Sequence, residues 1–512
     1  MAADSSLLPS LVEEYVSGLQ DSKAKDTATG VKGGQFTILQ LVEALGLSLT
    51  SSQPHTRARG VQLLSEVLQE CYGVFTVAEV EVLISFYENR LKDHHVVIPP
   101  VLQGLRALTK CTVLPPGSAV AMLRALFQDV HVQSLMLAER ACVYNMLLNL
   151  METREAELKG LGADFVFGFV QSMDGERDPR NLLLAFQVAK NIIHRGYELG
   201  SFTEEMFEVT SCYFPIDFTP PPNDPHGITR EELVVTLRDV LVGTPKFAEF
   251  LLPLIIEKLD SDVQSAKLDA LQTLTACVTR YERKDLAEFL GGLWASLRRE
   301  VFQTASEKIE SASLAAVTAL TSCLSRSVLK SDSEDSLHSF LELVLKGKDC
   351  KHHLCEPDLK LVWPSAKLLQ AACSASNRAG HIITSAVMPL LTEQYHSRTE
   401  CSHRRTLLEV VQKFIQAVKP RQSSEHGKYP FMSSRMVFSA LVETNASLQI
   451  TAASVLTLLA QQTGERGHMV HGQKSSSTSN TTNMSYLSGL LLDSDIELAV
   501  DHLTRLLLTE DD

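Results

Sequence analysis

Units of about forty residues recur along this chain, and each unit reads as two amphipathic helices joined by a short turn. In the segment 247–281 an apolar helix ends near Leu259, the turn "DSD" follows, and a second helix begins at Asp262. We expect Asp262 to be its N-cap, because a carboxylate accepts hydrogen bonds from the free N–H groups of a first turn. The second helix carries one apolar stripe at spacings of three and four residues: Leu268, Leu271, Leu274 and Val278.

The repeat predicts an extended helical array rather than a closed globule. Second helices are expected to open near residues 54, 94, 136, 178, 228, 262, 306, 358, 402 and 446, with turns at Asp93, Asp178 and Asn445. A lone pair of this size cannot bury its apolar stripe, so neighbouring pairs must stack. The period is that of HEAT or armadillo arrays, and two-helix units favour HEAT. Strand-like alternation is missing, which excludes a βαβ enzyme. The sequence therefore predicts an all-α HEAT-repeat (armadillo-type) α-solenoid over residues 1–462.

Two segments interrupt the array, and a third, residues 487–512, follows it. Residues 214–227 are rich in proline and predict a loop, after which Thr229 and Glu232 have the spacing of a capping box. This loop is equally consistent with a stiff connector and with a partner-binding segment. Residues 463–486 are polar and low in complexity, so we expect disorder there. Residues 487–512 read as the first helix of an incomplete repeat, which suggests a shortened form of a longer array or a fragment of one.

Charge and cysteine usage narrow the function classes. The chain has 512 residues with 47 Lys and Arg against 61 Asp and Glu, a net charge of −14. Because nucleic-acid binding needs a basic face to neutralise phosphates, we expect protein partners and no direct nucleic acid. The ten cysteines mostly sit singly in apolar helical patterns, as in a reduced compartment. The start has no secretory signal pattern, and no apolar run is long enough for a membrane span.

The segment "DCKHHLCEPD", residues 349–358, is the strongest candidate for chemistry, since it holds Cys350, His352, His353 and Cys355. Zinc prefers tetrahedral sets of Cys and His, but four ligands within six residues of one helix cannot all face one ion. Within the repeat, the segment reads as the end of a first helix that begins near residue 337, then a turn, then Asp358 as the cap of the next helix. We therefore expect a structural turn and no metal; these four residues stay the weak metal candidates.

Nothing else in the sequence points to catalysis. No glycine-rich phosphate loop and no His-Glu-x-x-His motif is present. We therefore expect no catalytic residues and no cofactor, and the partner-binding residues cannot be named from the sequence.

Several long, irregular strings resemble one family. "YENRLKDHHVVIPPVLQGL", "SMDGERDPRNLLLAF", "FEVTSCYFPIDFTPPPNDPHGI" and "HHLCEPDLKLVWPSAKLLQAA" are similar to the amino-terminal half of the MMS nineteen nucleotide excision repair protein family. The likeness runs from about residue 35 to 460 and resumes at "DIELAVDHLTRL". The Ser/Thr-rich piece around 474–486 departs from the family pattern and looks like an insertion.

The resemblance implies a non-enzymatic HEAT adaptor that targets cytosolic iron–sulfur cluster assembly to apoproteins of DNA repair, replication and transcription. It implies iron–sulfur assembly targeting factors and clients such as repair helicases as partners, no membrane, and a location in cytoplasm and nucleus with a link to the mitotic spindle. In the family the assembly-factor contacts lie mainly in carboxy-terminal repeats, which this chain lacks. Two alternatives stay open: a generic HEAT scaffold of the transport-receptor or phosphatase-subunit type, and a protein that carries a metal or cluster.

Overall fold

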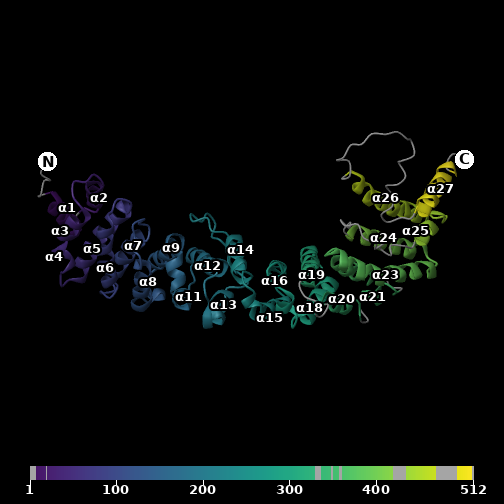
Figure 1. Ribbon diagram of the computed structural model, residues 1–512, viewed down its shortest axis with the longest axis horizontal. Coiled ribbons are helices and arrows are strands. Elements are labelled where there is room, and N and C mark those ends of the chain that lie inside the picture. Colours follow the sequence, from purple (N-terminus) through teal and green to yellow (C-terminus); the bar gives the residue numbers. More distant parts are fainter. Residues whose placement is uncertain are drawn as a thin grey trace. The chain divides into compact units, whose positions relative to one another are not determined.

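The computed structural model describes residues 7–18, 20–328, 336–346, 350–356, 360–418, 434–468 and 493–509. Within these ranges every regular element is a helix and none is a strand (Figure 1). The predicted all-α class is confirmed. No helix in the described ranges is both long and apolar enough to cross a membrane.

The chain forms two compact units, residues 1–250 and 251–512. The first unit contains α1 (Leu7–Val16), α2 (Lys23–Lys32), α3 (Ile38–Ala44), α4 (Gly46–Leu49), α5 (Pro54–Cys71), α6 (Val77–Arg90), α7 (Ile98–Leu108), α8 (Ser118–Asp129), η1 (Val132–Ser134), α9 (Leu137–Thr153), α10 (Glu155–Gly160), α11 (Ala163–Met173), α12 (Pro179–His194), η2 (Gly200–Phe202), α13 (Thr203–Ser211), α14 (Arg230–Leu241) and η3 (Pro245–Phe247).

The boundary between the units falls within α15 (Ala248–Leu259). The second unit continues with α16 (Gln264–Cys277), α17 (Arg283–Leu286), α18 (Leu290–Gln303), α19 (Glu307–Val328), α20 (Ser336–Leu345), α21 (Cys350–His353), α22 (Val362–Cys373), α23 (Asn377–Ser397), α24 (Cys401–Ala417), α25 (Ser434–Leu441), α26 (Ala446–His468) and α27 (Asp493–Thr509).

Second helices stack on one another in sequence order within each unit. In the first unit α5 packs on α7, α7 on α9, α9 on α12 and α12 on α14; in the second, α16 packs on α19, α19 on α22, α22 on α24 and α24 on α26. Each of these ten helices starts within four residues of its predicted position. The stacking of successive helix pairs confirms the HEAT-repeat α-solenoid, because each pair buries its apolar stripe against its neighbours.

The core around α5, α6 and α7 contains close contacts between a large aromatic side chain and small residues. Tyr87 of α6 is fully buried, and its hydroxyl lies 2.8 Å from the Ser65 hydroxyl of α5, which donates to the carbonyl of Pro100 at 2.6 Å. Gly104 of α7 leaves room for the Tyr87 ring, because a Cβ at that position would overlap the ring atoms. The buried phenol therefore keeps a hydrogen-bond partner while its ring fills the space between helices.

The predicted turns before α12 and α16 differ in how the following helix begins. Asp178 caps α12, its Oδ1 accepting from the Arg180 amide at 2.9 Å. Asp262 is not the N-cap of α16, so that prediction is wrong. The helix starts two residues later, and the Ser261 hydroxyl accepts from the amide of Val263, the N-cap residue, at 3.1 Å. This serine bond shapes the turn before the helix, and no side chain in the described ranges caps the first turn of α16.

Two predicted boundaries also need correction. The first helix expected to run from about 337 to 354 instead ends at Leu345, and Cys350–His353 forms the separate short helix α21. Helix α26 continues to His468, so residues 463–468 are helical although disorder was predicted from 463. Residues 469–486 lie outside the described residues.

Helix α27 is the final described element, as predicted for residues 487–512, of which 487–492 and 510–512 lie outside the described residues. It packs on α25, where the His502 and Phe438 rings lie 6.1 Å apart. Val500 and Leu503, two members of its predicted apolar stripe, are 56% and 38% exposed.

Candidate functional site

The Cys350/His353 half of the candidate metal cluster is built into the packing of α21 against α22. Cys350 is fully buried. His353 Nδ1 lies 3.0 Å from the hydroxyl of Ser365 on α22, and its ring lies 5.5 Å from that of Phe302. Through these contacts His353 holds the short helix α21 against α22, the second helix of the same repeat.

The His352/Cys355 half points to other partners. His352 Nδ1 lies 2.9 Å from Glu356 Oε1 at the surface. The Cys355 carbonyl accepts a hydrogen bond of 2.7 Å from Arg398, and burial raises the pKa of the Cys355 thiol, which opposes the thiolate that a metal needs. In the described part of the chain, no three His, Cys, Asp or Glu side chains are arranged to hold one ion. Asp358, the predicted cap, lies outside the described residues.

Ion pairs between adjacent repeats form a second kind of site, which was not predicted from the sequence. Arg57, the fourth residue of α5, donates to both carboxylate oxygens of Asp93, at 2.8 and 3.2 Å, and to the carbonyl of Ser51 at 2.8 Å. Asp93 lies in the turn before α7. Burial alone raises the pKa of Asp93, but hydrogen bonds from Arg57, the His94 amide and Arg90 outweigh it and lower the pKa to about 2.

The same arrangement recurs at the fourth residue of α9 and of α24. Arg140 binds Glu176 at 2.9 and 3.2 Å and the Leu135 carbonyl at 2.8 Å. Arg404 binds Glu443 at 2.7 Å and the Arg398 carbonyl at 2.7 Å. Each arginine thus links the loop before its own helix to the turn of the following repeat. The sequence signal was an arginine at this position with an acid 36 or 39 residues downstream.

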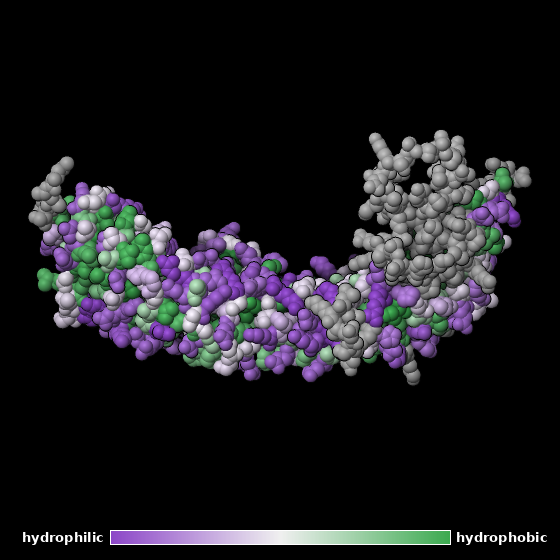
Figure 2. Space-filling model, in the orientation of Figure 1, coloured by the Kyte–Doolittle hydropathy of each residue, from purple (hydrophilic) through white to green (hydrophobic). Residues whose placement is uncertain are grey.

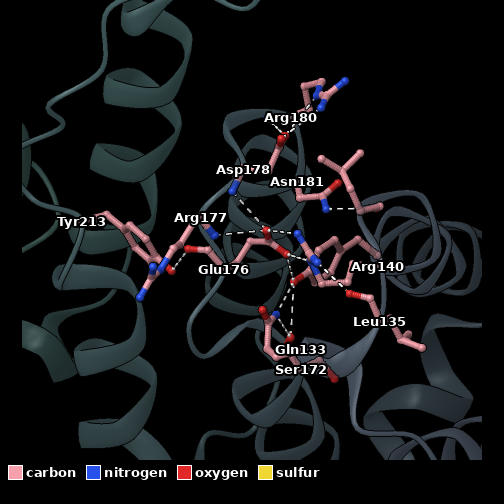
Figure 3. A network of polar contacts seen from close by, with 12 residues as sticks. Gln133, Leu135, Arg140, Ser172, Glu176, Arg177, Asp178, Arg180, Asn181 and Tyr213 are labelled. Carbon is pink, nitrogen blue, oxygen red and sulfur yellow. Dashed lines mark hydrogen bonds and ion pairs between the residues drawn. The ribbon is translucent and has the colours of Figure 1, made fainter.

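We call each of these ion-paired links between adjacent repeats a joint. Glu176 is the centre of the largest joint (Figure 3). Its side chain is buried, and besides Arg140 it accepts from the Tyr144 hydroxyl at 2.9 Å and from the amides of Arg177 and Asp178 at 3.1 and 3.2 Å. Burial disfavours the charged carboxylate, but these hydrogen bonds outweigh it and hold the pKa of Glu176 below its usual range. The carboxylate is therefore ionised and fully engaged, which suits a structural joint rather than acid–base chemistry.

The Glu176 joint also anchors the proline-rich loop. The hydroxyl of Tyr213, in the turn after α13, donates to the Glu176 carbonyl at 2.6 Å, and Figure 3 shows the Tyr213 side chain beside Arg177 and Glu176. At the far end of the loop, Thr229 and Glu232 form the predicted capping box of α14, which is confirmed. The loop is therefore held at both ends by named contacts.

Two polar cavities lie between neighbouring helices, one in each unit. The cavity in the first unit has a volume of about 520 Å³ and is lined by side chains of α5, α7 and α9, including Gln62, Glu66, Gln103, Arg106 and Glu139. Gln62 donates a hydrogen bond to Glu66 at 2.8 Å and another to Gln103 at 3.2 Å, and the second bond joins α5 to α7 of the neighbouring repeat. Oε2 of Glu139 is buried and accepts no hydrogen bond from the described residues.

The cavity in the second unit has a volume of about 820 Å³ and lies between α16 and α18. Lys267 binds both oxygens of Glu300, at 3.0 and 3.1 Å, and Arg299 pairs with Asp260 at 2.5 Å. Both cavities are polar and carry charges of both signs, whereas small-molecule sites are mostly apolar.

Figure 2 shows hydrophilic residues over much of the visible surface, with hydrophobic residues gathered near the end formed by α1 to α6.

Comparison with known proteins identifies the family. A family model described as "Dos2-interacting transcription regulator of RNA-Pol-II" matches residues 42–303. The chain is 65% identical over 529 residues to the MMS19 nucleotide excision repair protein homolog of Danio rerio, covering 100% of this chain and 48% of the relative. It is 57% identical over 516 residues to that of Xenopus tropicalis, again covering 100% and 48%.

The chain spans about half the length of the curated relatives it matches. Among solved structures, a crystal structure of importin beta is similar with a TM-score of 0.44 and 12% identity, covering 91% of this chain and 60% of that one. On the family model and the identity to these relatives, the chain belongs to the family of the MMS19 nucleotide excision repair protein homologs.

Proposed function

We propose that this chain is a non-enzymatic adaptor that serves nucleotide excision repair by binding other proteins. The observation that carries the proposal is the unbroken stacking of second helices within each unit, which in the first unit places polar side chains of α5, α7 and α9 along one cavity. Repeat arrays bind partners through such extended surfaces, with affinity concentrated in a few anchors. The names of the relatives support the repair context.

The chemistry of the candidate sites supports an adaptor. The ionisable side chains of the repeat joints are paired, as Arg57 with Asp93 and Arg140 with Glu176 show, and in the cavity of the second unit Lys267 is paired with Glu300. Such pairs neutralise each other and position the helices, so they do not supply a free nucleophile or base. The net charge of −14 disfavours binding to the phosphates of DNA, so we propose that the role in repair is exercised through proteins.

We further propose the finer role that the family resemblance implies: this chain helps to target cytosolic iron–sulfur cluster assembly to apoproteins of DNA repair, replication and transcription. Its partners would be the assembly targeting factors and clients such as repair helicases, in cytoplasm and nucleus and at the mitotic spindle. In the family, the contacts with assembly factors lie mainly in carboxy-terminal repeats. We therefore assign the binding of client proteins to the repeats of this 512-residue chain. The polar cavities beside Gln103 and Lys267 are the surfaces we assign to it.

Affinity capture tests this function. The 512-residue chain and the full-length relative of Danio rerio are used side by side as bait in extracts, and the captured proteins are identified by mass spectrometry. We expect the chain to capture iron–sulfur client enzymes, and the full-length relative to capture clients and assembly factors. Failure of both baits to recover either group would contradict the adaptor function. Recovery of a small GTPase or a phosphatase subunit instead would indicate a generic HEAT scaffold.

Variants of the cavities localise the surface. Gln103→Lys, in the first unit, and Gln264→Lys, which lines the cavity of the second unit, place a long cation in each cavity without breaking an ion pair described above; Gln103→Lys gives up only the hydrogen bond from Gln62. We expect at least one of them to reduce client capture. Arg405→Ala, at an exposed pair with Glu409, is the matched surface control and is expected to leave capture unchanged.

A further inference from the structure

The connection between α13 and α14 is longer than its task requires. The two helices pack directly on each other, yet residues 212–229 join them. Residues 174–178 suffice between α11 and α12, and residues 260–263 between α15 and α16. Long connections without secondary structure are uncommon in compact folds and are usually functional. Figure 1 shows this ribbon projecting at the upper edge of the view, beside α14. A connector alone does not explain the extra residues.

Proline holds the middle of this loop in an extended form. Pro220, Pro221 and Pro222 each have a fixed φ, and a residue that precedes proline is restricted to extended or polyproline II backbone. Thr219, Pro220 and Pro221 all precede a proline. Accordingly, residues 216–221 form neither helix nor turn. The run therefore has the constraints of a polyproline II segment, which needs no internal hydrogen bonds.

The extended run ends at a turn that its residues specify. The amide of Asp224 donates to the carbonyl of Pro221 at 3.2 Å, and Asn223 has a φ of 59°. With proline at the second position and a positive φ at the third, this is a type II turn, in which Pro222 keeps polyproline-like backbone. The extended segment therefore reaches from residue 217 to Pro222 before the chain reverses.

Contacts on both sides fix the loop to the solenoid. Ile216 is buried, and its carbonyl accepts from Arg230 Nε of α14 at 3.1 Å. Beyond the turn, His226 Nε2 lies 2.9 Å from Nη1 of Arg180 on α12. Together with Tyr213 at the Glu176 joint, these contacts hold the loop from both ends. An extended segment held in this way loses little conformational entropy when a partner binds it.

The segment presents apolar rings between acidic side chains. Residues 219–223, which include all three prolines, are exposed. Asp217 before them is exposed and Asp224 after them is half-exposed. We propose that residues 217–224 are a docking segment for a partner domain that binds polyproline II helices in an aromatic-lined groove with basic residues at its rim. The proline rings fill the groove, and the two carboxylates pair with the rim. This docking is separate from the binding of iron–sulfur clients.

The test measures binding of the whole 512-residue chain to an array of purified SH3, WW and EVH1 domains. We expect one or more domains with basic rims to bind. The variant Pro220→Ala/Pro221→Ala/Pro222→Ala is expected to weaken that binding by about tenfold or more, because it removes the anchors. Pro116→Ala, at an exposed proline in the connection before α8, is the matched control and is expected to leave affinity unchanged.

Binding that survives the triple substitution, or an array in which no domain binds the wild-type chain, would overturn the proposal. Circular dichroism and the thermal midpoint check that the triple variant folds. If it does not, a synthetic peptide of residues 213–230 decides the matter as a competitor against the wild-type chain: competition supports the docking segment, and its absence overturns it. Neither readout involves assembly factors or clients, so either result is independent of the proposed adaptor function.

Discussion

The guanidinium of Arg140 and the carboxylate of Glu176 form a two-pronged ion pair, with Nε 2.9 Å from Oε2 and Nη2 3.2 Å from Oε1, that joins helix α9 to the turn before helix α12. Burial of the apolar stripes holds neighbouring repeats together, but it allows one helix to shift slightly along the next. A bidentate pair has one favourable geometry, so it fixes the position of one repeat against the next. Arg57 and Asp93 repeat this relationship earlier in the same unit.

Substituting Arg140 by methionine should destabilise the first unit strongly. The Glu176 carboxylate would stay buried without its counter-charge, and breaking such a pair by removing one partner costs roughly 3–5 kcal/mol. Urea denaturation and hydrogen exchange at α9 and α12 measure the effect. Arg405→Met, which breaks an exposed pair with Glu409, is the matched control and should cost less than about 1 kcal/mol. Equal effects of the two substitutions would show that Glu176 does not depend on Arg140.

Acid should weaken the joint at Asp93 within a defined pH window. The folded-state pKa of Asp93 is lowered to about 2, below the value of about 3.9 expected in the unfolded chain. A lowered carboxyl pKa stabilises the fold fully above the unfolded value, and this contribution is lost as pH falls from about 4 to about 2. We therefore expect the difference in thermal midpoint between wild type and Asp93→Asn to be largest near neutral pH and to shrink below pH 4. A difference that stays constant down to pH 2 would contradict this account.

Removing the capping box should loosen the start of α14. The Thr229 hydroxyl accepts from the Glu232 amide at 3.2 Å, and Glu232 Oε2 accepts from the Thr229 amide at 2.8 Å. Thr229→Ala is expected to cost about 1 kcal/mol and to speed hydrogen exchange of the Glu232 amide, whereas Thr229→Ser keeps the acceptor and should retain most of the protection. Unchanged exchange in the alanine variant would mean that the box contributes nothing.

The cysteine–histidine segment should not determine metal content. His353 is engaged with Ser365 and His352 with Glu356, so the four candidate ligands do not converge. We expect elemental analysis after a chelator wash to give the same zinc and iron content for wild type and for Cys350→Ser/Cys355→Ser. Stoichiometric metal in the wild type that disappears in the double variant would establish a metal site.

The sequence predicted most of the array because the second-helix stripes repeat the same physics in each unit. Local cap signals were less secure: Thr229 forms the predicted capping box, but Asp262 is not the predicted N-cap, because α16 begins two residues later with Val263 as its N-cap. Cap chemistry depends on where within a turn the helix starts, and periodicity locates that start only to within a few residues.

The repeat joints were beyond reach of the sequence alone. Arg140 and Glu176 are 36 residues apart, and many other acids lie at comparable distances from an arginine. The pair forms because α9 packs beside the turn before α12, which brings Glu176 next to Arg140. Conversely, Cys350, His352, His353 and Cys355 are close in sequence but point to different neighbours, which is why their local pattern overstated the chance of a shared ligand.

The most direct test of the adaptor function is a binding titration between the purified 512-residue chain and a purified iron–sulfur repair helicase from which the cluster has been removed. We expect saturable binding, with affinity reduced by Gln103→Lys or Gln264→Lys and unchanged by Arg405→Ala. Absence of binding at concentrations where the full-length Danio rerio relative saturates the same helicase would contradict the assignment of client binding to these repeats.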